Sequence, residues 1–305
     1  MIKVAGQSNM QPLIPVLIGF AVFNAVLPPA LLAIEQAGPV PALLSGFNQS
    51  GVVWLSLAVA VHLLLKRPSA TNTPHQAQTS AAVSAALPVW LICFSFLLII
   101  PLASLAWIVA AALTIVWQRA FDLSVHQKAA CILICAIALR GPVTLVCLTL
   151  FSSEILNFDT QAAALLLQLQ GTTFSVTENV ITNANGHSLL ILTGCSVFTN
   201  LSLAMLLWLS LTLLYQNQIQ RADIWRLAAV IVVQLSLNAA RLSVMATDIS
   251  WYRFLHDGFG ETLFEWSTLL TALLFVKWRT SDESLPDRTV HPAARNDYCA
   301  SHPPG

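Results

Sequence analysis

The chain has 305 residues, of which 56% are hydrophobic and only 9% are charged, and its formal net charge at pH 7 is zero. A typical soluble domain carries about 25% charged residues, so the composition excludes a water-soluble fold and indicates a polytopic membrane protein. The zero net charge argues against nucleic acid as a partner, because binding to phosphates favours a basic surface.

Apolar runs long enough to cross a bilayer recur along the chain. A bilayer core needs about 20 apolar residues per helix, and on this basis the sequence predicts eight membrane spans. The long run at 85–117 is divided at Pro101 into two short spans, and the first run is too long for the apolar region of a cleavable signal peptide. The remaining predicted spans are 13–34, 43–65, 129–151, 195–214, 224–247 and 259–278.

Local features modify these spans. The proline pair at 28–29 predicts a kink towards the far end of the first span. Residues 68–84 are rich in Ser, Thr, Ala and Gln and predict a flexible loop. The triplet Arg140-Gly141-Pro142 interrupts the fifth span. Arg140 marks either the cytoplasmic start of a shorter span beginning at Pro142 or one half of a packing ion pair.

Basic residues are distributed unevenly between the two sides of the predicted membrane domain. With the N-terminus inside, eleven of them fall on cytoplasmic segments, and only Arg253 falls on an outer segment, apart from two Arg inside spans. This strong positive-inside signal predicts an even number of spans with both termini cytoplasmic. The cytoplasmic set is Lys3, Lys66, Arg67, Arg119, Lys128, Arg221, Arg226, Lys277, Arg279, Arg288 and Arg295.

The longest outer segment, 152–194, contains no Lys or Arg. Residues 160–170 within it predict a short amphipathic helix that lies on the membrane. Two strand-like runs, 173–182 and 187–193, flank an Asn-Ala-Asn-Gly sequence at 183–186, and Asn-Gly between such runs is a strong hairpin signal. The hairpin leads directly into the sixth span. It acts either as a linker or as an edge that binds an extended peptide by strand addition.

The sequence thus predicts an all-α polytopic membrane protein with about eight transmembrane helices and an extracytoplasmic β-hairpin before the sixth. Residues 1–278 form its single integral membrane domain. The polar, Pro-containing segment 279–305 predicts a disordered cytoplasmic tail.

Cys195 is the first residue of the predicted sixth span. A thiol at a helix N-terminus lies at the positive end of the helix dipole, which favours the nucleophilic thiolate, and polar residues such as Thr193 and Ser196 flank it. The alternative is a small buried hydrophobic residue, as predicted for the other cysteines in the spans. Cys131 and Cys135 are four residues apart on an apolar helix, a spacing that favours packing over metal binding. Neither a metal nor a cofactor is predicted.

Arg241 lies within the seventh span, about a turn and a half before its outer end, and Asn238 shares its helix face. An Arg inside a span is costly unless it is paired or lines a polar cavity, so it is a functional candidate by default. The alternative is that Arg241 extends to the outer interface. The second polar residue on the same face favours a polar pocket instead.

His256 lies in the loop before the eighth span. Imidazole exchanges protons near neutral pH, so it can accept the proton of a thiol and later return one to a leaving amine. An ordinary interfacial His is the alternative, and His187 on the hairpin is a rival base. Asp257 or Glu261 is placed to orient the imidazole of His256.

Four short motifs connect these residues: Gln170-Gly171-Thr172, Thr193-Gly194-Cys195-Ser196 after the hairpin, Asn238-Ala239-Ala240-Arg241-Leu242, and His256-Asp257-Gly258-Phe259-Gly260. Together they resemble the exosortase/archaeosortase family of membrane-embedded cysteine transpeptidases. The resemblance covers about residues 139–278, which would be the catalytic part. One difference is Val197, which stands where the family usually has Gly after Ala-Cys-Ser.

The resemblance implies a role for each candidate residue. Cys195 would be the nucleophile, Arg241 the oxyanion-stabilising or substrate-positioning residue, and His256 the acid/base. A nucleophile, a cation and a proton carrier on one outer face also suit acyl transfer on chemical grounds alone. The supporting residues would be Asn238, Ser196 and Asp257.

The resemblance also implies a thiol protease or transpeptidase of the bacterial inner membrane, with its active site on the periplasmic side. Its partners would be membrane lipid and exported proteins whose C-terminal sorting signal combines a Pro-Glu-Pro-like motif, one transmembrane helix and a basic cluster. Cleavage would leave a thioester on Cys195, which an amine or water would resolve.

Two other classes stay open. In a polytopic transporter, Arg241, Asn238 and His256 would line a polar cavity. A non-catalytic assembly protein of an exopolysaccharide export system would tolerate the loss of Cys195, whereas the enzyme would not.

Overall fold

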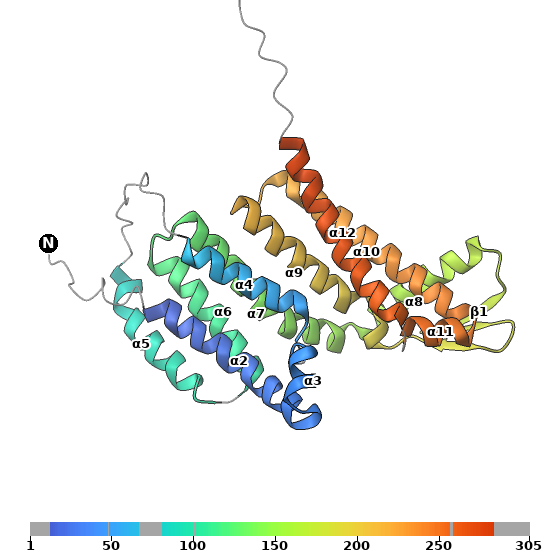
Figure 1. Ribbon diagram of the computed structural model, residues 1–305, viewed down its shortest axis with the longest axis horizontal. Helices are drawn as coiled ribbons and strands as arrows, with labels where there is room; N and C mark the ends of the chain where they lie inside the picture. The colour runs from blue at the N-terminus through green and yellow to red at the C-terminus, as the bar shows by residue number, and fades with distance from the viewer. Residues whose placement is uncertain (1–12, 48, 67–80, 101, 257–258, 284–305) are drawn as a thin grey trace, which may run out of the picture.

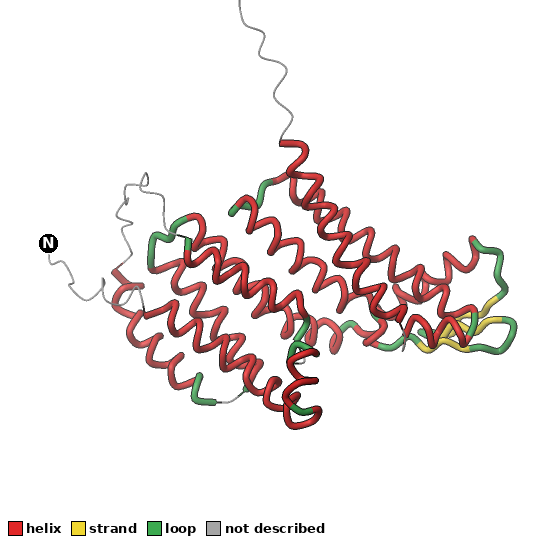
Figure 2. The backbone as a smooth tube through the Cα atoms, viewed as in Figure 1, coloured by secondary structure: helices red, strands yellow, loops and turns green. Residues whose placement is uncertain are grey.

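The computed structural model describes residues 13–47, 49–66, 81–100, 102–256 and 259–283, and most of them are helical (Figure 1 and Figure 2). The elements in chain order are α2 (Leu13–Ala37), α3 (Pro39–Leu44), α4 (Gly51–Leu65), α5 (Ala81–Leu97), α6 (Ala103–Ala120), α7 (Val125–Leu150), α8 (Ser152–Leu169), β1 (Phe174–Thr177), β2 (Val180–Asn183), β3 (Ser188–Leu190), the 3-10 turn η1 (Thr193–Cys195), α9 (Val197–Gln216), α10 (Arg221–Thr247), α11 (Ile249–His256) and α12 (Phe259–Glu283).

Among the described residues, five helical segments are long and apolar enough to cross a membrane: α2, α6, α7, the stretch from η1 through α9, and α10. Shorter apolar helices cover Gly51–Leu65, Leu87–Leu97 and Trp266–Phe275. Large apolar side chains such as Val16 and Phe23 are exposed on the outside of the bundle, where lipid suits them better than water. The chain therefore has the helical architecture that its composition predicts.

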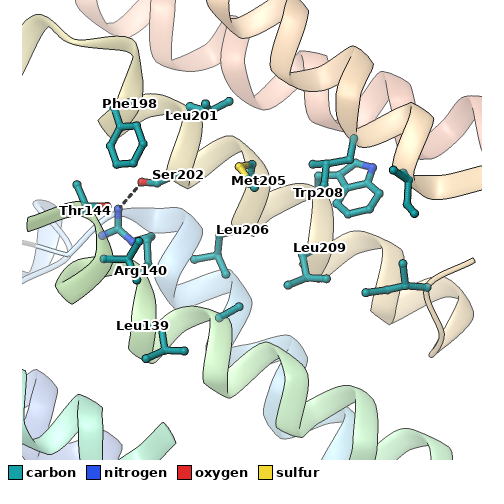
Figure 3. A pocket seen from close by; sticks show the side chains of 15 residues that line it. Leu139, Arg140, Thr144, Phe198, Leu201, Ser202, Met205, Leu206, Trp208 and Leu209 are labelled. Carbon is teal, nitrogen blue, oxygen red and sulfur yellow. Dashed lines mark hydrogen bonds between the residues drawn. The ribbon is translucent and has the colours of Figure 1, made fainter. Parts of the chain in front are cut away.

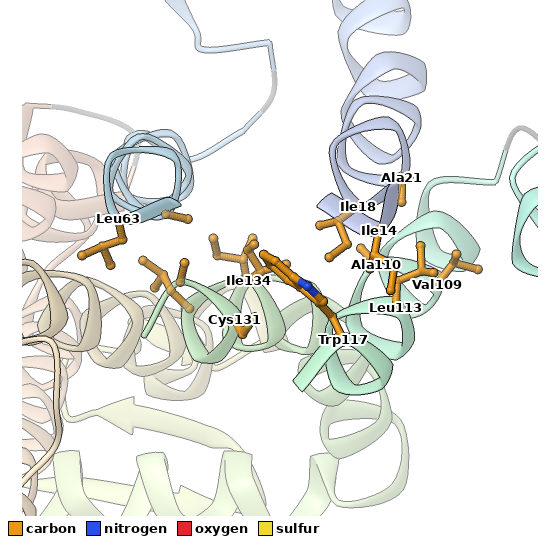
Figure 4. Close-up of a cluster of buried hydrophobic side chains, with 14 of the residues drawn as sticks. Ile14, Ile18, Ala21, Leu63, Val109, Ala110, Leu113, Trp117, Cys131 and Ile134 are labelled. Atoms are coloured by element: carbon orange, nitrogen blue, oxygen red, sulfur yellow. The ribbon is translucent and has the colours of Figure 1, made fainter. Parts of the chain in front are cut away.

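The N-terminal helices enclose the larger hydrophobic core. α2 packs on α6, and α7 packs on both α4 and α6. Figure 4 shows the side chains of Ile14, Leu113 and Trp117 within this cluster. A buried hydrogen bond of 2.7 Å between the hydroxyls of Ser56 and Ser210 joins α4 to α9. This contact connects the N-terminal core to the helices that carry the candidate site.

The predicted second span, 43–65, is shorter in the structure. Its first residues belong to α3, and α4 begins only at Gly51. The backbone turns between the two helices, where Gly46 and Phe47 adopt φ of 64° and 55°. Ser50 then caps α4 by accepting a hydrogen bond from the backbone N–H of Val52. The prediction of one continuous helix is wrong because these polar and left-handed residues end one helix and start another.

The predicted break at Arg140-Gly141-Pro142 is also wrong, because α7 continues from Val125 to Leu150. Arg140 is therefore neither the start of a span nor half of an ion pair with a described residue. Its Nη1 donates a hydrogen bond of 3.3 Å to the hydroxyl of Ser202 on α9. The hydroxyl of Ser202 on the neighbouring helix α9 gives the Arg140 side chain a polar partner, so α7 continues through this residue.

Other boundaries agree with the sequence or shift by a few residues. The division of 85–117 into two helices is confirmed, since α5 ends at Leu97 and α6 begins at Ala103; Pro101 itself lies outside the described residues. α5 begins at Ala81, inside the predicted loop at 68–84. α12 continues to Glu283, past the predicted end of the last span at 278, and residues 284–305 of the predicted tail lie outside the described residues.

The predicted hairpin is a three-stranded antiparallel sheet in the order β1-β2-β3. The run 173–182 folds back on itself at Glu178, whose φ is 54°, so that Thr177 pairs with Val180. The turn at 183–186 forms between β2 and β3, as predicted. The predicted amphipathic helix at 160–170 is the second half of the longer helix α8.

The sheet, α8 and α11 lie together at one end of the bundle, and the α6–α7 and α9–α10 connections lie at the other end with the last turn of α12 (Figure 1). The first group comes from segments that the charge distribution predicts as outer, and the second from segments that it predicts as inner. His256 ends α11 in the first group, and Cys195 lies in η1, which follows β3 in the chain.

The side chain of Asn183 attaches the sheet to the end of α10. Its Nδ2 donates to the carbonyl of Thr247 at 2.6 Å, and its Oδ1 accepts from the backbone N–H groups of Asn185 at 2.9 Å and His187 at 3.0 Å. We expect Asn183→Ala to cost about 1–3 kcal/mol of stability, because backbone groups lose their partners, and to speed hydrogen exchange in β2 and β3. Thermal unfolding and hydrogen exchange of the purified protein measure both effects.

The matched control is Asn185→Ala, which removes an exposed amide side chain from the same turn. This control should leave both readouts unchanged. Equal behaviour of the two variants would show that the sheet does not depend on the Asn183 contacts.

Candidate functional site

Cys195 is the last residue of η1 and immediately precedes the N-cap of α9. Its backbone N–H donates to the carbonyl of Leu192 at 2.9 Å, and only 7% of the residue is exposed. Ser196 caps α9 by accepting a hydrogen bond of 3.2 Å from the N–H of Phe198. The thiol therefore lies beside the helix N-terminus rather than within the helix, as a buried free cysteine.

A buried carboxylate, that of Asp159 on α8, holds the backbone next to Cys195. Its Oδ2 accepts a hydrogen bond from the N–H of Val197 at 3.2 Å, and its Oδ1 accepts one from Nδ2 of Asn238 at 3.4 Å. The same Nδ2 donates to the carbonyl of Cys195 at 3.4 Å. The network joins α8, α10 and the start of α9, and the positive end of the α9 dipole favours a carboxylate there.

Asp159 is absent from the residues predicted from sequence. It is 3% exposed and lies on the face of α8 that also buries Leu156 and Ala163. A carboxylate at helical spacing from buried apolar residues is the one sequence signal that marks it. Burial raises the pKa of Asp159, and hydrogen bonds from Ser196, Val197 and Asn238 offset part of this shift.

Arg241 lies on α10 and reaches α11. Its Nη2 donates a hydrogen bond of 2.8 Å to the carbonyl of Leu255, and its guanidinium carbon lies 4.8 Å from the ring centroid of Phe264. Its Nε is buried and has no hydrogen-bond partner in the described part of the chain. Buried N–H groups are normally paired, so this donor retains the capacity for one more hydrogen bond.

His256 ends α11, and its ring stacks on Tyr252 with 4.9 Å between the ring centroids. The rival base His187 contacts the same Tyr252: its ring meets the tyrosine edge-on, and its Nε2 is 3.1 Å from the carbonyl of Met245. Asp257 lies outside the described residues, and the side chain of Glu261 is not described either.

One hydrophobic cluster contains Cys195 and residues that neighbour the other two predicted catalytic residues in the chain. It contains Cys195 together with Leu242 of α10, and Tyr252 and Leu255 of α11 pack against it. Arg241 is the neighbour of Leu242 and bonds to Leu255, and His256 follows Leu255. The structure thus brings together the chain segments that carry Cys195, Arg241 and His256, at the junction of η1, α10 and α11, and Asn238 and Ser196 belong to the network around Asp159.

Gly260 explains how α12 approaches this junction. A Cβ on Gly260 would lie 2.7 Å from the carbonyl oxygen of Phe254 and 2.8 Å from a side-chain carbon of Leu255. Only a residue without a side chain lets the start of α12 pack this closely against α11. The position of Leu255, and with it the acceptor for Arg241, therefore depends on Gly260.

No family model, curated protein or solved structure matches this chain. The resemblance to exosortases therefore rests on the four motifs quoted above. Among the described residues, no group of three His, Cys, Asp or Glu side chains is placed to hold a metal ion.

The raised pKa of Asp159 predicts how stability depends on pH. A carboxyl group whose pKa is higher in the folded protein than the ordinary 3.8 stabilises the fold below pH 3.8, and this contribution is lost as pH rises through the folded pKa. Asp159→Asn removes this dependence. We therefore expect the stability of wild type, measured by thermal unfolding, to fall relative to that of Asp159→Asn as pH rises from 3.8 through the folded pKa.

Asp248→Asn is the control with the opposite sign. Hydrogen bonds from Ser250 lower the pKa of the exposed Asp248, so its contribution is present above pH 3.8 and is lost as pH falls. If the stability of wild type and that of Asp159→Asn changed with pH in the same way at every pH, the raised pKa of Asp159 would be contradicted.

Gly260→Ala tests the contact between α11 and α12. The added methyl group forces the two helices apart, and we expect about 1–3 kcal/mol of destabilisation, as for overpacked cores. Gly194→Ala is the matched control next to Cys195, because a Cβ there meets nothing within 4 Å. Thermal unfolding of both variants checks this, and equal stabilities would show that the close approach is not required.

Proposed function

We propose that this protein is a membrane-embedded thiol protease or transpeptidase of the exosortase type. The observation that carries the proposal is the environment of Arg241. Its chain neighbour Leu242 belongs to the cluster that contains Cys195, and Leu255, whose carbonyl accepts its hydrogen bond, packs against that cluster. Arg241 also keeps a buried N–H without a partner in the described part of the chain. A preorganised donor beside a nucleophile is what stabilisation of a developing oxyanion requires.

The proposed reaction begins when His256 takes the proton of the Cys195 thiol and Sγ attacks the carbonyl carbon of the scissile peptide bond. Arg241 stabilises the negative charge that develops on the carbonyl oxygen. The C–N bond then breaks, the leaving amine takes the proton from His256, and the acyl group remains on Cys195 as a thioester. An amine or water attacks this thioester and loses a proton through His256 to the departing thiolate, which restores the thiol.

Asp159 and Asn238 act as positioning residues in this proposal. The Asn238 amide bridges the Asp159 carboxylate and the Cys195 carbonyl, which fixes the backbone that carries the nucleophile. Fixed geometry matters because small displacements of reacting groups cost large factors in rate.

The proposed setting is the bacterial inner membrane, crossed eight times, with both termini cytoplasmic and the site on the periplasmic side. Support comes from the charge distribution and from the grouping of the sheet, α8 and α11 at one end of the bundle (Figure 1).

The proposed substrates are exported proteins with a C-terminal Pro-Glu-Pro-like motif, a transmembrane helix and a basic cluster. The extended motif has a place to bind at β3, an outer strand of the described sheet that leads into η1, by strand addition. The acceptor is an amine or water.

Substitution in cells tests the thiol mechanism. Cys195→Ser, expressed with a tagged exported protein that carries such a sorting tail, should leave the tail uncleaved at normal enzyme abundance. Cys147→Ser is the matched control, because Cys147 is a half-buried thiol of α7 outside the cluster around Cys195, and it should process normally. Arg241→Lys should slow processing by about 100-fold or more, as for the loss of an oxyanion donor.

A blot of the tagged substrate shows whether its sorting tail has been cleaved. If wild-type enzyme accumulates as the thioester intermediate, hydroxylamine should release the acyl group from Cys195. Continued processing by Cys195→Ser would refute the enzyme. The transporter or the assembly protein would then be the better account of the polar residues on α10.

A further inference from the structure

A second feature of the molecule is a groove on the side of the bundle, between α7, α9 and the start of α10. It encloses a volume of about 520 Å³, and its lining is almost wholly apolar, as with Leu139 and Val143 on α7, Phe198 and Met205 on α9, and Ile224 on α10 (Figure 3). Cys195, Arg241 and His256 do not line it. The groove is therefore separate from the candidate site.

Arg140 is the one charged residue in the lining. Its Nη1 donates to the hydroxyl of Ser202 at 3.3 Å (Figure 3). That hydroxyl donates in turn to the carbonyl of Thr199 at 2.7 Å. A guanidinium has five N–H donors, and this neutral hydroxyl is the only hydrogen-bond partner of Arg140 among the described residues, which also provide no ion pair for it. The cation thus has donors left for an anion.

The position of Arg140 along the groove gives the groove two chemically different ends. Ser202 is the sixth residue of α9, about 8 Å from the end of α9 that carries Cys195, at 1.5 Å per residue. From there the lining continues along α9 to Leu209 and then to Ile224 without another charge. A cation near one membrane surface followed by an apolar channel complements an amphiphile with an anionic head.

We propose that this groove binds one phospholipid of the leaflet on the Cys195 side, with its phosphate on Arg140 and an acyl chain along α9. Guanidinium binds phosphate with two parallel hydrogen bonds, and the chain fills a surface where Leu139, Val143 and Ile224 are exposed. A net negative headgroup is favoured over a zwitterionic one because no described carboxylate neutralises Arg140. A purely apolar helix in the groove would leave this charge uncompensated, which is costly within a membrane.

Native mass spectrometry of the delipidated full-length protein tests the site. Phosphatidylglycerol and phosphatidylcholine with identical acyl chains are titrated separately into the detergent-solubilised protein, and the bound copies are counted. We expect one phosphatidylglycerol to bind about tenfold or more tightly than phosphatidylcholine. Arg140→Gln should abolish this preference, since hydrogen bonds to charged groups contribute at least that much.

Arg119→Gln is the matched control, because it removes the same charge from an exposed position at the end of α6, outside the groove. It should keep the preference. Met205→Trp fills the groove while leaving Arg140 intact, so it should reduce binding of both lipids, and it carries the test if Arg140→Gln does not fold. Cys195→Ala should bind lipid as wild type does, which separates this site from the proposed catalysis.

The proposal is overturned if Arg140→Gln keeps the preference, if wild type binds the two lipids equally, or if Met205→Trp binds both as wild type does. It is also overturned if a photocrosslinker at Met205 captures the transmembrane helix of a sorting-tail protein instead of lipid.

Discussion

The arrangement around Cys195 depends on the buried carboxylate of Asp159. An ion taken out of water is stable in a folded protein only when hydrogen bonds replace its hydration. Here the donors come from the first turn of α9 and from Asn238 on α10, so that satisfying one charge fixes three helices relative to one another. Cys195 precedes the first of these donors by two residues, and its carbonyl accepts a hydrogen bond from the second, so the network gives the backbone of the buried thiol a defined position.

The polar groups of α10 continue this organisation towards the centre of the bundle. Gln234, Asn238 and Arg241 are four and three residues apart and therefore share one face of the helix. Each keeps one buried polar atom without a partner among the described residues, and Thr268 of α12 donates to Gln234 at 3.1 Å. Such groups destabilise an apolar interior. These polar groups lie together on one face of α10, whereas the N-terminal core is built almost entirely from apolar side chains.

Arg241 and Arg140, two arginines inside apolar helices, have different neighbours. Arg241 donates a hydrogen bond to a backbone carbonyl of α11 and packs on an aromatic ring of α12. Arg140 bonds to a hydroxyl and faces a lateral apolar groove. In both cases the partner is neutral, so the guanidinium keeps its charge and some of its donors for a group from outside the chain. The proposed partners are a substrate carbonyl for Arg241 and a lipid phosphate for Arg140.

The sequence alone determined the membrane class, the positions of the apolar helices and the turn at 183–186, because hydrophobicity and turn chemistry act over a few residues. It also marked Cys195, Arg241 and His256 as unusual in their local settings. The tertiary structure decided the rest. The partner of Asp159 is 79 residues away on another helix, and the partner of Arg140 is 62 residues away, so neither role has a local signature. Whether a polar residue ends a helix, pairs or lines a groove depends on which distant side chains complete its hydrogen bonds.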